Sequence, residues 1–251
     1  MNRSIRCMSL LATSAVLFSA CDSVNTPEAH PAIFQLAPWL GEESLKYNLV
    51  EPRGAVDGTC ILETKPKFEA GHTKLSQLCD DGLGHRDDRV AVVDAATLSP
   101  LMTIRTITNE SKNTRTTFEA VYEGNSAGLT ADTDGKKTST TRAKPQASTK
   151  VPEPAWYDDE SIFWVIRGIS LASGLKASYT NLNPGNGRVF NVSVEVETQE
   201  NVKVPAGEFK TWKIKVKTES ITQFFWVEVA APNRVIKARI ERIIYEFVGN
   251  P

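Results

Sequence analysis

The sequence predicts a mainly β protein built on one large, curled antiparallel sheet with one short helix packed on it. Two observations indicate this class. Apolar and polar residues alternate over successive short segments, and the connections between the segments are short and rich in Gly, Pro and Asp. Such connections join antiparallel neighbours, because a parallel crossover needs a dozen or more residues. A sheet of about ten strands must curl, split or close to remain stable, so we expect a half-barrel or open barrel.

The first twenty residues have the pattern of a bacterial signal peptide. Arg3 and Arg6 precede an apolar stretch, residues 8–18, which is too short for a membrane-spanning helix of about 20 residues. The stretch closes with Leu-Phe-Ser-Ala before Cys21, which matches the lipobox of lipoprotein signal peptidase. We therefore expect residues 1–20 to be removed and Cys21 to carry acyl chains such as palmitate. The alternatives are an ordinary signal peptide with an incidental cysteine, or an internal helix.

These features predict a lipoprotein on the periplasmic or extracellular face of the cell envelope. Each buried acyl methylene contributes about 0.8 kcal/mol, so the lipid on Cys21 makes the membrane the first expected partner. Removing residues 1–20 leaves 27 basic and 30 acidic side chains. Because this balance offers no basic face, we expect no nucleic-acid partner.

Two cysteines remain once Cys7 is cleaved off and Cys21 is acylated. In an oxidising compartment, Cys60 and Cys79 are expected to form a disulfide. The alternative is a catalytic or metal-binding thiol pair, but the spacing is not C-x-x-C and no histidine lies at ligand spacing.

The chain divides into residues 1–20 as signal peptide, residues 21–44 as lipidated cysteine and tether, and residues 45–251 as a single β-rich domain. Three prolines prevent a continuous helix in the tether. Its apolar residues have two possible surfaces to pack against, the domain or the membrane; they are Ile33, Phe34, Leu36, Trp39 and Leu40.

The β-rich domain contains about ten segments with the alternation of strands. The clearest places Val192, Val194 and Val196 on one face, and residues 212–217 alternate with lysines outward. Residues 123–150 are polar and predict either a hairpin with a long loose loop or partial disorder. The expected strands are residues 45–50, 59–64, 73–79, 89–94, 101–108, 115–122, 189–197, 212–217, 222–229 and 235–248.

One segment, residues 158–168, departs from the β pattern. It begins with three acids, ends at Gly168, and carries apolar residues at helical spacing. We expect a helix of about three turns on the sheet. Asp158, Asp159 and Arg167 are interpreted as residues that cap and salt-bridge this helix.

An ordered set of short motifs runs along the chain: Lys46-Tyr47, Val93-Asp94, Leu98-Ser99-Pro100, Asp158…Ser161…Arg167, Val204-Pro-Ala-Gly-Glu-Phe209 and Trp226…Pro232. Together they resemble an exported family of unknown function, domain of unknown function thirty-one-oh-eight. The resemblance runs from about Leu45 onward and implies a curled antiparallel sheet of the half-barrel kind found in envelope lipoproteins. The family implies no activity or catalytic residue, and the Cys60–Cys79 pair and the threonine-rich loop are not features of it.

No catalytic or metal-binding pattern is evident, and we expect no catalytic residue, metal or cofactor. The chain lacks a Gly-x-Ser-x-Gly elbow, and His30, His72 and His85 are expected in solvated loops or the tether. Two clusters of Asp and Gly, at residues 80–88 and 132–135, are interpreted as turns, because their spacing does not match a calcium loop.

Aromatic side chains are the remaining candidates for a binding surface. Phe224 and Trp226 should face the side opposite to Phe225, so one face would pack the helix and the other would line a concavity. Trp164, Phe224 and Trp226 are therefore candidate ligand-lining residues, and simple core filling is the alternative.

Two functions are consistent with this sequence. The first is a non-enzymatic, membrane-anchored envelope lipoprotein that binds an apolar or amphipathic ligand in its curled sheet. The second is a structural or assembly lipoprotein that binds another envelope protein by its surface. An enzyme ranks third, since it would need a cleft with strongly perturbed titratable groups, such as Arg167 against Asp158 or Asp159.

Overall fold

The computed structural model describes residues 29–52 and 54–251, in which fifteen strands form one sheet. The predicted signal peptide and Cys21 lie outside the described residues. The elements are β1 (Glu43–Val50), β2 (Val56–Phe68), η1 (Glu69–Gly71), β3 (His72–Asp80), β4 (His85–Val93), β5 (Pro100–Asn109), η2 (Glu110–Lys112), β6 (Thr114–Glu123), β7 (Ser126–Thr133), β8 (Lys136–Ala143), β9 (Trp156–Asp158), α1 (Ile162–Val165), η3 (Ile166–Gly168), β10 (Lys176–Asn183), β11 (Arg188–Val204), β12 (Gly207–Lys217), β13 (Thr222–Glu228), β14 (Val235–Ile240) and β15 (Ile243–Gly249).

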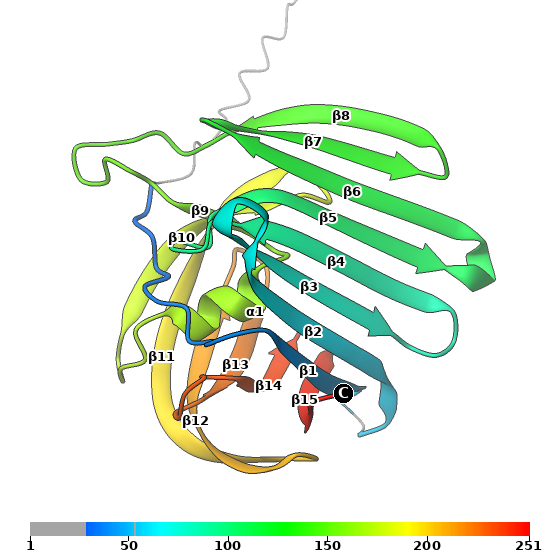
Figure 1. Ribbon diagram of the computed structural model, residues 1–251, viewed down its shortest axis with the longest axis vertical. Helices are drawn as coiled ribbons and strands as arrows, with labels where there is room; N and C mark the ends of the chain where they lie inside the picture. Colours follow the sequence, from blue (N-terminus) through cyan, green and yellow to red (C-terminus); the bar gives the residue numbers. More distant parts are fainter. Residues whose placement is uncertain (1–28, 53) are drawn as a thin grey trace, which may run out of the picture.

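The sheet consists of two meanders joined where the chain begins and ends. Its order is β8-β7-β6-β5-β4-β3-β2-β1-β15-β14-β13-β12-β11-β10-β9, so the first and last strands are neighbours at its centre. Tyr47 of β1 lies opposite Phe247 of β15 and Cys60 of β2. All neighbouring pairs are antiparallel except β9 and β10, which run parallel. The sheet curls around α1, as Figure 1 shows, and the predicted fold class is confirmed.

Side chains bring the two edges of the sheet together without backbone pairing between β8 and β9. The ring of Tyr122 on β6 lies edge-on to that of Trp156 on β9, with centroids 5.3 Å apart. Arg142 of β8 donates through Nε to the carbonyl of Gly187, next to β11, over 2.6 Å. A small apolar cluster continues this contact with Ala120, Leu129 and Leu182. We call this line of contact between β6–β8 and β9–β11 the seam. It makes the open sheet resemble a closed barrel.

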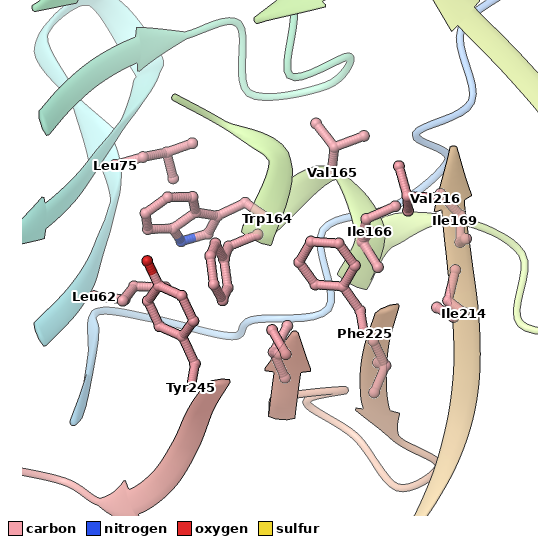
Figure 2. Close-up of a cluster of buried hydrophobic side chains, with 14 of the residues drawn as sticks. Leu62, Leu75, Trp164, Val165, Ile166, Ile169, Ile214, Val216, Phe225 and Tyr245 are labelled. Carbon is pink, nitrogen blue, oxygen red and sulfur yellow. The ribbon is translucent and has the colours of Figure 1, made fainter. Parts of the chain in front are cut away.

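The helical segment fills the inside of the curl. Phe163 packs its ring against those of Tyr47, Phe225 and Tyr245, and Trp164 is 1% exposed. Figure 2 shows Trp164, Phe225 and Tyr245 in the same cluster of buried side chains. A helix that is apolar on every side has to be buried. One face of the sheet therefore surrounds α1, and this face carries the main core.

The helix is shorter than the three turns expected from the sequence. One α turn, α1, is followed by one 3₁₀ turn, η3. Asp158 cannot begin the helix because it ends β9 and pairs with β10. Gly168 does end it as predicted, and any side chain there would overlap the ring of Phe34.

Residues 29–42 form a strap across one end of the curl. Ile33, Phe34 and Trp39 are buried, whereas Leu36 and Leu40 are exposed. Backbone hydrogen bonds join Gln35 to Gly168 and Ala155 to His30. Most of the apolar residues of the tether thus pack on the domain, and we refer to this end as the strap end.

Arg167 ties the strap end together, which corrects its predicted pairing within the helix. Its guanidinium lies 2.7 Å from the Glu43 carboxylate, donates to the carbonyls of Pro232 and Asn233, and covers the ring of Trp39. The partners come from β1, the strap and the β13–β14 turn. They are distant in sequence, so local spacing could not identify them.

The strand predictions need three further corrections. Residues 123–150 contain an ordered hairpin, β7 and β8, so the hairpin alternative holds and the long loose loop does not. β8 is polar because it is an edge strand with exposed faces. Residues 235–248 form two strands, β14 and β15, separated by a turn at Glu241, and β9 and β10 were not predicted.

Candidate functional site

A cavity of about 700 Å³ lies inside the curl at the end remote from the strap. Its mouth is formed where β10 turns into β11, β12 into β13 and β14 into β15. Its inner end reaches Ile162, the first residue of α1. We refer to this end of the molecule as the open end.

One wall of the cavity is apolar. It consists of inward-facing side chains of β11, β12, β14 and β15, the strands whose alternation was clearest in the sequence. They are Phe190, Val192, Val216, Ile240 and Ile243.

The opposite wall is polar and lies along the seam. β4 and β5 contribute Arg89 and Arg105, whereas β10 and the segment before α1 contribute Asn181, Asn183 and Asp159. In the strand order, β6–β8 separate β5 from one edge of the sheet, and β10 is next to the other edge strand, β9; β1–β3 and β11–β15 lie between β4 and β10 around the curl. The cavity therefore has two chemically different walls facing each other.

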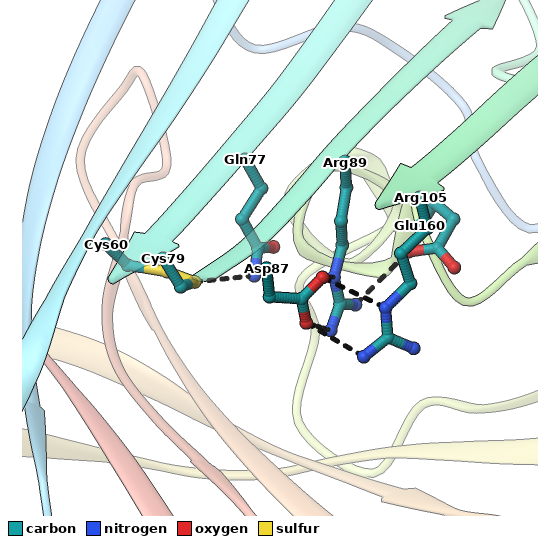
Figure 3. Close-up of a disulfide and its surroundings, with 7 residues drawn as sticks. All are labelled: Cys60, Gln77, Cys79, Asp87, Arg89, Arg105 and Glu160. Atoms are coloured by element: carbon teal, nitrogen blue, oxygen red, sulfur yellow. Dashed lines mark hydrogen bonds and ion pairs between the residues drawn. A yellow bond between two sulfur atoms is a disulfide. The ribbon is translucent and has the colours of Figure 1, made fainter. Parts of the chain in front are cut away.

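Asp87 neutralises the two arginines of the polar wall. Arg89 and Arg105 are directly opposite each other on β4 and β5, an arrangement of like charges that destabilises a sheet. Each guanidinium forms two hydrogen bonds to Asp87, with shortest distances of 2.6 Å and 2.8 Å (Figure 3). Such forked pairs are among the strongest charge-assisted hydrogen bonds.

Three consecutive acids, residues 158–160, connect strands from both sides of the seam. Asp158 accepts a hydrogen bond from the Tyr122 hydroxyl on β6 over 2.8 Å. Asp159 accepts one from each of the amides of Asn181 and Asn183 on β10, both over 2.6 Å. Glu160 lies 3.2 Å from Arg89 on β4. The acids that were predicted to cap the helix instead hold the barrel together.

Burial and neighbouring charges shift the pKa values of these acids in different directions. Desolvation raises the pKa of Asp158 to about 6 and that of Glu160 to about 7. Desolvation also raises the pKa of Asp159, while the amides of Asn181 and Asn183 and the charges of Arg89 and Arg105 oppose the shift. Desolvation would raise the pKa of Asp87 as well, but the hydrogen bonds and charges of Arg89 and Arg105 outweigh it and lower that pKa. Near neutral pH, Glu160 therefore exchanges its proton most readily.

The predicted disulfide between Cys60 and Cys79 is present and lies beside the polar wall. The two cysteines are direct partners on β2 and β3, and Cys79 is opposite Asp87 of β4. The Gln77 amide donates to Cys79 Sγ over 3.1 Å (Figure 3). The disulfide thus links β2 to β3, and β3 is the neighbour of β4, which carries Asp87 and Arg89.

The three aromatic residues predicted to line a ligand site do not share one surface. Trp164 fills the core and donates from Nε1 to Thr64 over 2.7 Å. Phe224 and Trp226 face outward, as the alternation predicts, because Phe225 packs against Phe163.

Outside the curl, Phe224 lies under the guanidinium of Arg239 and Trp226 donates to Glu200. The expectation that helix and concavity occupy opposite faces is wrong. The curl places both on its inner face.

Sequence reasoning named Asp159 and Val192 but missed most of the residues that line the cavity. One usable signal was present in β4, where Asp87 and Arg89 share the inward face with buried Ala91 and Val93. Charges at inward positions of a strand need partners inside the fold. This pattern identifies a buried polar group, although it does not identify Arg105 or Asn183 as its neighbours.

Both clusters of Asp and Gly contain turns, as predicted, but Asp87 and Asp88 of the first cluster lie on β4 instead. Asp80 and Asp81 accept backbone hydrogen bonds from residues 82, 83 and 85, and Asp132 accepts one from Gly135. His85 starts β4 at the cavity mouth, and His72 starts β3. Across residues 29–52 and 54–251, no group of three or more His, Cys, Asp or Glu side chains is arranged to hold a metal ion. No helix in this part of the chain is long and apolar enough to cross a membrane.

Comparison with known proteins identifies a family and two similar structures. The family model "Protein of unknown function (DUF3108)" matches residues 80–243, about two thirds of the chain. A β-barrel-like protein of domain of unknown function DUF1849 from Brucella abortus has 10% identity and a TM-score of 0.49, over 84% of this chain and 97% of that one. A predicted exported protein with a YmcC-like fold from Bacteroides fragilis has 12% identity and a TM-score of 0.29, over 88% and 100%. A search of curated proteins gave no significant match.

Proposed function

The chain belongs to the DUF3108 family of proteins of unknown function, as its motifs predicted, and we propose that it is a non-enzymatic envelope lipoprotein that binds an amphipathic ligand. The ligand would occupy the cavity at the open end of the curl. The lipid on Cys21 would hold the domain at the membrane from which such a ligand comes.

The two-walled cavity carries this proposal. Ligand sites in proteins are commonly concavities of about 300–1,000 Å³ with apolar walls and a few placed polar groups. The cavity here, at about 700 Å³, fits this description. Its walls belong to the sheet, and Asp87 binds both arginines of the polar wall, which holds them in place.

Two features support export and anchoring. The sequence pattern that ends at Cys21 is typical of lipoprotein signal peptides. The Cys60–Cys79 disulfide is typical of an oxidising compartment such as the periplasm. Only seven residues separate Cys21 from Ala29, the first residue described, so an anchored domain would lie close to the membrane surface.

A second function, binding another envelope protein, is favoured by one observation at the strap end. Leu36 is 76% exposed and Leu40 is fully exposed, although both belong to a strap that otherwise packs on the domain. Exposed apolar groups of this kind suit a partner protein or the membrane itself.

Native mass spectrometry distinguishes the two functions. The mature chain with Cys21→Ala, which cannot be acylated at this site, would be purified from a bacterial periplasm, and its ligands would be extracted with organic solvent. We expect a hydrophobe that leaves only on unfolding. A mass equal to the bare chain would favour the protein-binding function, and crosslinking would then search for the partner.

Two matched variants assign the ligand to the cavity. Ile243→Trp places an indole inside the cavity, whereas Ile244→Trp places it outside on the next position of β15. The co-purifying ligand should be lost from the first variant and retained by the second. Equal retention by both variants would exclude the cavity as the binding site.

A further inference from the structure

The positive charges around the cavity do not outnumber the negative ones. Four arginines line it: Arg89, Arg105, Arg188 and Arg242. Five carboxylates line it or pair with these arginines: Asp87, Asp159, Glu160, Glu219 and Glu241. The cavity therefore offers no excess of positive charge to an anionic head group.

Asp159 is the acid of the polar wall that no arginine holds directly. Its two oxygens accept hydrogen bonds from Asn181 and Asn183, whose side chains are neutral. A carboxylate has about four acceptor positions, so each oxygen of Asp159 can accept a further hydrogen bond from a ligand. An anionic group of a ligand placed here would be repelled by the Asp159 carboxylate, whose charged form is already destabilised by burial.

The polar wall also offers donors. Arg105 uses Nε and one terminal nitrogen for Asp87, and a guanidinium carries five N–H donors in total. The side chain of Arg105 is 25% exposed. It lines the same cavity as Asp159, but it comes from β5, on the other side of the seam. A hydroxyl group, which both donates and accepts, matches such a mixture of acceptors and donors.

The opposite wall determines what the rest of the ligand must be. Val192, Val216 and Ile243 present aliphatic surface, and Phe190 adds an aromatic ring. Burying apolar area against them contributes roughly 25 cal/mol per Å². A ligand that satisfies both walls is polar on one side or end and apolar on the other.

We propose that the polar part of the ligand is an uncharged, hydroxyl-rich group of the glycosyl kind, bound by Asp159, Asn183 and Arg105. Its apolar part lies against β11–β15. This inference rests on the proposed ligand-binding function and names the class of ligand.

The test compares three probes with the same eight-carbon chain: octyl glucoside, octanoate and octylammonium. Each is titrated below its micelle concentration into the mature Cys21→Ala chain by calorimetry, after any co-purified ligand has been extracted. We expect octyl glucoside to bind about tenfold more tightly than either charged probe, because only the hydroxyls match the wall without adding charge. Equal or tighter binding of octanoate or octylammonium would overturn the ligand class but leave ligand binding intact. No binding of any probe, with no ligand in the extract, would count against the proposed function itself.

Two variants assign the head group to the polar wall. Asp159→Asn keeps the shape of the side chain but removes its charge, and Asn183→Leu removes one amide. Each should weaken octyl glucoside binding about tenfold, the effect of losing one or two hydrogen bonds to a charged group. Asn191→Leu, on the exposed face of β11, is the matched control and should leave octyl glucoside binding unchanged.

Thermal melting must show that the variants are folded. Unchanged binding in both wall variants would refute the assignment to Asp159 and Asn183.

Discussion

The two ends of the curled sheet treat their charged groups in opposite ways. At the strap end, Arg167 is 3% exposed and is surrounded by Glu43, two backbone carbonyls and the ring of Trp39. At the open end, Arg105 shares Asp87 with Arg89 and still faces a cavity. The comparison indicates that one end is closed for stability, whereas the other retains polar groups in contact with open space.

Two tryptophans test how much the packing around α1, inside the curl, contributes to stability compared with the outer face of the sheet. Trp164→Ala should lower the free energy of unfolding by about 3–5 kcal/mol, because it leaves a cavity in the core and removes the N–H group that donates to Thr64. Trp226→Ala, on the outer face, should cost less than about 1 kcal/mol. Chemical denaturation measures both values. Equal losses would show that the inner and outer faces of the sheet contribute alike.

The strap end predicts the next largest effect. Arg167→Ala should lower the free energy of unfolding by about 3 kcal/mol, because it leaves Glu43 with little solvent and without its cation. Arg188→Ala is the matched control at the open end, where both partners of the ion pair are about 60% exposed. It should cost less than about 1 kcal/mol. A small loss for Arg167→Ala would mean that the strap is not held by this residue.

The disulfide beside the polar wall should contribute less than the core contacts. Replacing Cys60 and Cys79 together by Ala should cost roughly 2–3 kcal/mol, because the unfolded chain gains the freedom of a short loop. The fold should persist, since the core of β11–β15 does not depend on the bridge. If reduction of the wild-type protein leaves Tm unchanged, the bridge has no stabilising role.

The smallest expected effect is the pH dependence of the free energy of unfolding that arises from Glu160. Glu160 has a raised pKa of about 7 in the folded protein, compared with an ordinary value of 4.5. Between these values the folded state binds more protons than the unfolded state, so the free energy of unfolding falls as pH rises. The stabilisation is fully present only below about pH 4.5 and is lost as pH rises through about 7, which amounts to roughly 2 kcal/mol between pH 5 and pH 7.5.

The Glu160→Gln variant should therefore lose less stability than wild type between pH 5 and pH 7.5, as measured by denaturation at each pH. Glu219→Gln, at an exposed ion pair, should keep the wild-type slope. An unchanged slope in Glu160→Gln would show that this residue does not titrate in the range.

Local patterns were sufficient for most strands and for the disulfide. The alternation of β11 and β12 is a property of consecutive residues, and Cys60 and Cys79 were the only pair left in an oxidising compartment. The helix length and β9 were not predicted, because Asp158 is recruited by Tyr122 and β10 over long sequence distances. The candidate site was least predictable. Its walls come from strands that are far apart in the sequence. Phe224 and Trp226 stood out in the sequence more clearly than the residues that line the cavity, although they lie on the outer face.

The sequence by itself determined the class of this protein: a β-rich chain of antiparallel strands with a disulfide bond. These features depend on the period of two in a strand, on turn chemistry and on residue type, which act over a few residues. Only the tertiary structure decided which face became the inside, and which charges met there. Arg142 reaches Gly187 and Asp159 reaches Asn183 because the curl closes through side chains, and the free energy of that closure depends on all strands together.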